Sequence, residues 1–340
     1  MNLRRTAVLA AVLFAASAAA TPSMSATAAS ARTEHSAHRE WVCVVTNHAP
    51  DRETTLRLPN VLVDRLVEHT RSYHGPCAEY GERATLGDGE LIAYSQAVGS
   101  RPLSVGLIMT DGSLDGLPHD PPNDGAWCFD KDGDGTVDPM SECTGGYETQ
   151  LDLGAEFRRE VDTPYTYVLT NWNPHGHIPL GVYDLPHFDV HFYVNEDAER
   201  TAIRPGPCPH LVNCDDYQLG KRLPDAKYLA PDFADMDAVE PGMGNHLIDP
   251  TAPEFNGEPF THTWIYGVWD RQVTFYEAMV THEWFDGLRR GTIDDGCYDF
   301  KLPSAWQEPG WYPTSYCLRH RDNRGEVTVS LENFVHRHAS

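Results

Sequence analysis

The sequence is short of basic residues and, after its first twenty residues, of long apolar runs. It carries 26 lysines and arginines against 50 aspartates and glutamates, which gives a net charge of −24 at pH 7. A surface with this balance repels nucleic acid and anionic lipid and attracts cations. No later apolar run approaches the roughly 20 residues that a transmembrane helix needs. We therefore expect no nucleic-acid partner and no membrane span.

The motifs of several enzyme classes are also missing. The chain has no Gly-x-Ser-x-Gly elbow and no phosphate-binding Gly-Lys-Ser/Thr loop. The segment His282-Glu283-Trp284 begins like a His-Glu-x-x-His zinc motif but lacks the second histidine. These absences argue against the common serine hydrolases, nucleotide-binding enzymes and zinc proteases.

Long helical patterns are scarce, whereas proline and glycine are frequent, with 25 and 27 residues. This composition predicts a mainly β protein, an antiparallel sandwich or barrel-like domain with long loops and disulfides. One short N-terminal helix is expected over residues 60–71. Hairpins are expected at 90–98 with 103–110 and at 261–268 with 273–281.

The first 31 residues have the pattern of an export signal and its processing region. Arg4 and Arg5 form a basic start, and residues 7–20 are small and apolar. We therefore expect a secreted or otherwise extracytoplasmic protein. The predicted organisation continues with an N-terminal segment containing the helix (32–82), a β domain (83–285) and a C-terminal extension (286–340).

All eight cysteines follow the signal, and an even number in an exported chain favours disulfides. A metal–thiolate site is the alternative, but the chain has no Cys-x-x-Cys pair. The simplest arrangement joins nearest neighbours in the sequence: Cys43–Cys77, Cys128–Cys143, Cys208–Cys214 and Cys297–Cys317.

An acidic, glycine-rich loop lies within residues 128–143, and its first nine positions from Asp130 fit an EF-hand-type calcium loop. Position twelve is Ser141, and Glu142 follows one residue late. Pro139 argues against long flanking helices. The alternative is a solvated acidic turn without an ion. The predicted calcium ligands are Asp130, Asp132, Asp134, Thr136, Asp138 and Glu142.

Residues 187–194 alternate between polar and apolar side chains, which predicts a strand with one face in the core. The other face carries His187, Asp189 and His191, residue types that bind metals or move protons. Four rises of roughly 3.3 Å separate the two histidines by about 13 Å, too far to share one ion in a regular strand.

A metal on this strand needs ligands from elsewhere in the chain. His246 and His177 are the candidates, with His175 beside the latter. Mixed histidine and carboxylate ligands suit Zn, Mn, Fe, Ni or Cu, and the sequence does not choose among them. The alternative is an exposed polar strand face that holds no ligand.

Glu277 is predicted to lie on an otherwise apolar strand face, beside Phe275 and Met279. A carboxylate in this position needs a partner or a raised pKa. Glu277 is therefore the candidate general base if the protein is an enzyme. The alternative is an edge-strand glutamate, or a buried one held by a structural hydrogen bond.

Several blocks also carry a family resemblance. They are residues 103–107 with 114–118, residues 171–177 through 181–193, residues 242–246, and Tyr266-Gly267 with 275–279. Over residues 83–285 the chain resembles the TTHB210-like family of exported bacterial proteins of unknown function. The resemblance implies a mainly β, oligomer-forming domain without an established activity. The family residues that map onto this chain are Gly176, His177, His187, Asp189, His191, His246 and Glu277.

The leading interpretation is an exported, disulfide-stabilised protein that binds divalent cations, with calcium in the acidic loop and a transition metal or small-molecule ligand at the histidine strand. A secreted metalloenzyme, a hydrolase or an oxidoreductase with Glu277 as base, is the first alternative. The second is a structural homo-oligomer in which the histidine face is a contact between subunits.

Overall fold

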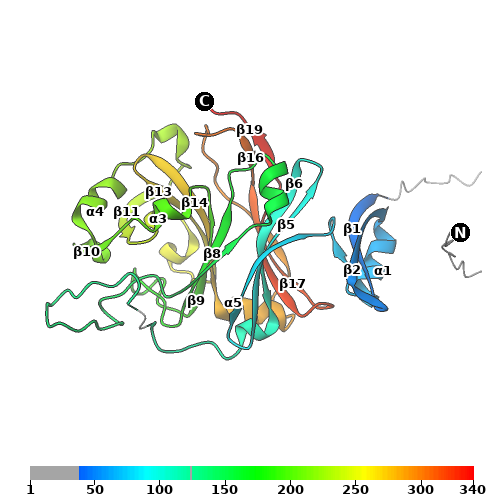
Figure 1. The fold of residues 1–340 in the computed structure, drawn as a ribbon, viewed down its shortest axis with the longest axis horizontal. Helices are drawn as coiled ribbons and strands as arrows, with labels where there is room; N and C mark the ends of the chain where they lie inside the picture. Colours follow the sequence, from blue (N-terminus) through cyan, green and yellow to red (C-terminus); the bar gives the residue numbers. More distant parts are fainter. Residues whose placement is uncertain (1–37, 123–124) are drawn as a thin grey trace, which may run out of the picture. The chain divides into compact units, whose positions relative to one another are not determined.

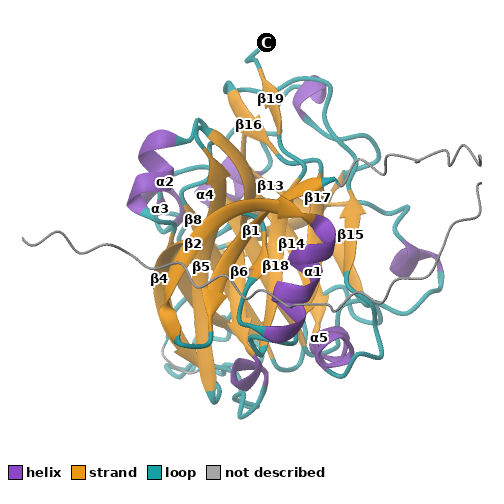
Figure 2. Cartoon of the chain, turned by 90° about the vertical axis from the view of Figure 1, so that its right-hand side faces the viewer, coloured by secondary structure: helices purple, strands orange, loops and turns teal. Residues whose placement is uncertain are grey.

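Two large antiparallel sheets dominate the computed structural model, which describes residues 38–122 and 125–340. The predicted signal peptide lies outside the described residues. The described residues from 38 onward form one compact unit. Figure 1 shows the two sheets as adjacent layers, with β8, β9 and β14 in one and β5, β6 and β17 in the other. Strands outnumber helices, and the helices are short (Figure 2).

The first sheet has seven strands and carries the histidine strand near its middle. Its spatial order is β11 (Ala234–Glu240), β12 (Gly244–Ile248), β13 (His262–Trp269), β14 (Gln272–Thr281), β9 (His187–Tyr193), β8 (Tyr167–Asn173) and β7 (Tyr147–Asp152).

The second sheet has six strands and combines distant parts of the chain. Its order is β15 (Gly296–Asp299), β17 (Ser315–Arg321), β18 (Glu326–Glu332), β6 (Arg101–Thr110), β5 (Gly89–Val98) and β4 (Glu79–Leu86). β18 pairs with β6 along its whole length, so residues beyond 286 contribute strands to this sheet.

The main core lies between the two sheets and is built from alternate residues of their strands. Burial of apolar surface of this kind stabilises the fold by roughly 25 cal/mol for each Å² removed from water. The first sheet contributes Phe188, Val190, Phe192, Trp264, Tyr266, Tyr276, Ala278 and Val280, and the second contributes Leu91, Ala93, Val105, Leu107, Met109, Leu318, Val327, Val329 and Leu331.

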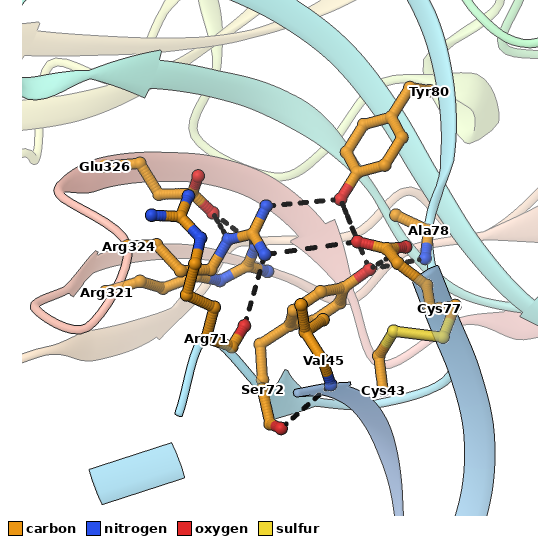
Figure 3. A network of polar contacts seen from close by, with 12 residues as sticks. Cys43, Val45, Arg71, Ser72, Cys77, Ala78, Tyr80, Arg321, Arg324 and Glu326 are labelled. Carbon is orange, nitrogen blue, oxygen red and sulfur yellow. Dashed lines mark hydrogen bonds and ion pairs between the residues drawn. A yellow bond between two sulfur atoms is a disulfide. The ribbon is translucent and has the colours of Figure 1, made fainter. Parts of the chain in front are cut away.

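A small N-terminal sheet joins β2 (Ala49–Pro59), β1 (Arg39–Thr46) and β3 (Tyr73–His74), with α1 (Asn60–His69) between β2 and β3 in the chain. It contacts the β17–β18 hairpin through Arg324, whose guanidinium lies 4.8 Å from the Tyr73 ring centre. Arg324 also pairs with Glu326 at 2.8 Å and reaches Tyr80 Oη at 3.4 Å (Figure 3). Arg324 Nη1 also lies 4.0 Å from a carboxylate oxygen of Glu53 on β2, so a cation–π contact and an ion pair tie this sheet to the hairpin.

The remaining elements are short and lie in the connections. They are α2 (Ala155–Glu160), α3 (Asp197–Arg200), β10 (Pro205–Cys208), α4 (Cys214–Gly220), α5 (His282–Arg289), the pair β16 (Gly310–Tyr312) and β19 (Val335–Arg337), and 3₁₀ turns at Asp111–Leu114, Pro209–Leu211, Ala226–Tyr228 and Pro253–Asn256. Among the described residues, no helix is long and apolar enough to cross a membrane.

The predicted mainly β fold with antiparallel sheets and disulfides is confirmed. All four nearest-neighbour cysteine pairs are present as disulfides. The predicted hairpin over residues 261–281 is present as β13 and β14, and it turns at Asp270 and Arg271, both with positive φ.

Candidate metal centre

The histidine strand β9 is buried on both of its faces. Phe188, Val190 and Phe192 belong to the core between the sheets, and His187 and His191 point to the opposite face with no exposed surface. Other parts of the same chain cover that opposite face. Burial of polar side chains costs free energy unless they find partners. The polar face of β9 must therefore be satisfied within the protein.

The first ligand group surrounds Asp189. His187 Nε2 lies 3.1 Å from Asp189 Oδ1, and His177 Nε2 lies 3.4 Å from Asp189 Oδ2. His177 arrives from the loop between β8 and β9, and its side chain is 32% exposed. Asn173, at the end of β8, donates to Asp189 Oδ2 at 2.7 Å. One loop and two neighbouring strands therefore bring these side chains together.

The second ligand group surrounds Glu277 on β14, which stands directly opposite His191 in the strand pairing. Glu277 Oε2 lies 3.5 Å from His191 Nε2 and 3.9 Å from His246 Nε2, the latter from β12. Gly267 on β13 lacks a side chain, and the Phe275 ring fills that space. The Phe275 ring centre lies 5.0 Å from both imidazoles and helps to fix their positions.

Hydrogen bonds fix which nitrogen carries the proton in three of the four imidazoles. His187 Nδ1 lies 2.6 Å from Leu185 O, His177 Nδ1 lies 2.7 Å from Ile178 O, and His246 Nδ1 lies 3.1 Å from Ala238 O. A carbonyl oxygen only accepts, so each Nδ1 is the donor. In the neutral ring Nε2 then presents a lone pair to a carboxylate oxygen, which is repulsive unless a proton or a metal ion lies between them. Histidines that bind metals commonly donate their other ring N–H to a carbonyl in this way.

The distances between donor atoms have the size expected around one ion. Two ligands at about 2.1 Å from a tetrahedral metal are about 3.4 Å apart. Three of the four nitrogen–oxygen distances, 3.1, 3.4 and 3.5 Å, are close to this edge length, and the fourth is 3.9 Å. In each group the three donor atoms all lie within 4.8 Å of one another. Both groups could therefore hold a metal ion.

Charge is distributed differently in the two groups. Burial by itself raises the pKa of Asp189, but the adjacent His187 and His177 outweigh it and hold the pKa well below its usual range. Burial likewise lowers the pKa of His177, but the Asp189 carboxylate raises it to about 9. Without a metal, the first group therefore contains an ionised carboxylate beside a protonated imidazole at neutral pH.

The second group is neutral under the same conditions. Burial, together with the charges of Asp189 and Glu240, raises the pKa of Glu277 well above its usual value. Burial lowers the pKa of His246 and lowers that of His191 to about 3. His191 Nε2 and Glu277 Oε2 are buried without a hydrogen-bond partner among the described residues. A proton on Glu277 can bridge to only one of its two imidazole neighbours, which leaves the other nitrogen unmatched.

The acidic loop brings three of its predicted calcium ligands together, since oxygens of Asp130, Asp132 and Asp134 lie within 4.8 Å of one another. Asp130 accepts from the backbone N–H groups of Gly133 and Gly135 at 2.7 and 2.9 Å, so the loop winds around this carboxylate. Both glycines have positive φ, as the tight turn requires.

The other predicted calcium ligands have local roles in the loop. Glu142 is buried and accepts from the N–H groups of Lys131, Asp132 and Asp138. It therefore closes the loop from within rather than facing outward. Hydrogen bonds from Thr136 lower the pKa of Asp134, and one from Ser141 lowers that of Asp138. The Cys128–Cys143 disulfide joins the two ends.

The structure divides the predicted histidine cluster into two groups that share no residue. His177, His187 and Asp189 form one, and His191, His246 and Glu277 form the other. His175 lines the cavity above them but belongs to neither ligand group. Sequence reasoning missed Asn173, whose only signal was its place in the block before His177.

A bulge between Gly267 and Val268 sets Glu277 opposite Ile265 in the pairing of β13 with β14. His262, at the start of β13, contacts Tyr316 of the second sheet. His187, His191 and Glu277 on this face are buried by residues of the same chain. Oligomer formation stays a prediction.

Comparison of the chain with family models, curated proteins and solved structures finds no match. The similarity to the TTHB210-like family therefore stays a prediction, and the function has to be argued from the site itself.

Proposed function

We propose that this chain is an exported, disulfide-stabilised protein that binds two transition-metal ions side by side on the outer face of its seven-stranded sheet. His177, His187 and Asp189 hold one ion, and His191, His246 and Glu277 hold the other. The four disulfides indicate an oxidising, extracytoplasmic environment. Export agrees with the basic and apolar start of the sequence.

One observation carries the proposal. In three imidazoles, Nδ1 donates a hydrogen bond to a backbone carbonyl. Nε2 of each of these rings faces a buried carboxylate at 3.1 to 3.9 Å. A metal ion between these atoms satisfies every lone pair at once, whereas a single proton in each group cannot. The mixture of imidazole and carboxylate donors suits Zn, Mn, Fe, Ni or Cu rather than calcium or magnesium, which prefer oxygen ligands.

Metal analysis of protein purified without a histidine tag tests this proposal. We expect about two transition-metal ions per chain after dialysis against a weak chelator. The His187→Ala/His191→Ala variant removes one ligand from each group and should lose both ions while keeping its fold by circular dichroism. The control His69→Ala/His74→Ala changes two exposed histidines and should retain both ions. Metal-free wild-type protein, or full occupancy in the first variant, contradicts the proposal.

We also propose that the acidic loop binds one calcium ion. The specific support is the convergence of Asp130, Asp132 and Asp134, with the loop wound around Asp130 by two backbone N–H groups. Carboxylates this close repel one another unless a cation offsets their charge. Isothermal titration of chelator-treated protein with calcium tests this second site, and the absence of binding heat contradicts it.

A further inference from the structure

A cavity of about 820 Å³ lies above the two ligand groups. The polar residues that line its floor include Asp189, His246, Glu277 and His177, and apolar side chains form much of its wall. The wall includes Tyr183, Met243, Ile248, Phe255, Ile265 and Met279. Cavities of roughly 300–1,000 Å³ with apolar walls and a few polar groups are typical of small-molecule sites.

The mouth of this cavity is apolar as well. Leu180 is 78% exposed, Met140 61%, Met236 54% and Ile178 43%, and all four line the cavity. They come from three separate segments: the acidic loop, the loop before β9, and β11. Single exposed apolar side chains are common, but several gathered at one opening are typical of a binding site. An apolar surface therefore continues from solvent to the ligand groups.

The charges around the cavity narrow the class of molecule. Apart from histidines, Lys131 is the single basic residue among those that line it, whereas Asp189, Glu240 and Glu277 are acidic. A bound metal ion would then be the main positive charge to which an electron-rich donor group could bind. Three protein ligands per ion also leave a coordination position for such a group.

We infer that the cavity binds an apolar organic molecule that carries one metal-binding donor group. The apolar body packs against the methionine- and isoleucine-containing wall, and the donor completes the coordination of an ion on the floor. This inference rests on the proposed metal centre and adds the class of ligand that the centre takes.

Two hydroxamic acids test it on cobalt(II)-loaded protein, in which the visible spectrum reports on the metal. Acetohydroxamic and octanohydroxamic acid share one donor group and differ only in alkyl chain length. Each methylene buried improves affinity roughly fourfold. With several methylenes in the cavity, we expect octanohydroxamic acid to bind at least about 50-fold more tightly.

The Leu180→Asp/Met236→Asp variant places two charges at the mouth. It should lose most of this chain-length preference and keep its affinity for acetohydroxamic acid. The control Val61→Asp/Leu62→Asp makes the same change on the exposed side of α1 and should keep the preference. Equal affinities in cobalt-loaded wild type, or an unchanged preference in the mouth variant, overturn the inference alone. Failure to bind cobalt at all overturns both the inference and the proposed metal centre.

Discussion

Two ligand groups without a shared side chain should stabilise the protein in two independent steps when metal is added. Asp189→Asn removes the carboxylate of the first group, and Glu277→Gln removes that of the second. Both replacements keep the shape of the side chain and leave the other group intact. The structure therefore predicts that each variant loses one step and that the double variant loses both.

The size of each step follows from mass action. At a free metal concentration 100 times the dissociation constant, one site stabilises the folded state by about 2.7 kcal/mol. Loss of a side chain that only hydrogen-bonds to a metal ligand weakens metal affinity roughly 10- to 100-fold, so loss of a ligand itself removes most of that step. For a chain of this length, 1 kcal/mol shifts Tm by about 2 °C. We expect metal to raise Tm by about 10 °C in wild type and about 5 °C in each single variant.

Scanning calorimetry of chelator-treated protein, with and without zinc, measures these shifts. The His69→Ala/His74→Ala variant serves as control and should behave as wild type. If either single variant lost the entire rise in Tm, the six residues would form one site rather than two. If both kept the entire rise, neither carboxylate would be a metal ligand and the account of the site would be refuted.

Three further predictions concern the acidic loop and the charge of the first group. Calcium chelation should lower the Tm of wild type. Asp132→Ala should abolish that sensitivity, and the control Asp64→Ala should retain it. A wild type whose Tm does not change with chelator contradicts the calcium assignment. The Cys128→Ser/Cys143→Ser variant should bind calcium up to about 100-fold more weakly, because closing a loop of this length in the flexible chain costs about 3 kcal/mol. Unchanged affinity by calorimetric titration would show that the disulfide does not support calcium binding. In metal-free protein, the pKa of His177 is raised from 6.5 to about 9 by Asp189. Its contribution to stability is therefore fully present below pH 6.5 and lost as the pH rises through about 9. The urea midpoint should fall over that interval in wild type and less in His177→Gln, and equal slopes would contradict the ion pair.

Most of what the sequence predicts about the site comes from the alternation of polar and apolar residues in its strands. The polar and apolar sides of residues 187–194 identified β9, and the rise per residue excluded one ion shared by His187 and His191. The cysteine pairs could also be predicted from the sequence, because each disulfide joins cysteines that are neighbours in the chain. The position of Glu277 on the same strand face as Phe275 and Met279 followed from period two.

The remaining features depend on tertiary structure that no local pattern encodes. The sequence does not reveal that β14 lies beside β9, which sets Glu277 opposite His191. Nor does it reveal that β12 pairs with β13 and so brings His246 into the same sheet. Alternation alone also leaves the burial of the polar face undecided, because a strand with alternating polarity usually leaves its polar side in water.

The most direct test of the metal centre is a crystal of protein soaked in zinc, with anomalous diffraction measured on both sides of the zinc edge. Two peaks are expected, one about 2.0–2.1 Å from Nε2 of His177 and His187 and one at about the same distance from Nε2 of His191 and His246. Peaks confined to surface carboxylates, with none between these imidazoles and the carboxylates of Asp189 and Glu277, would contradict the proposed metal centre.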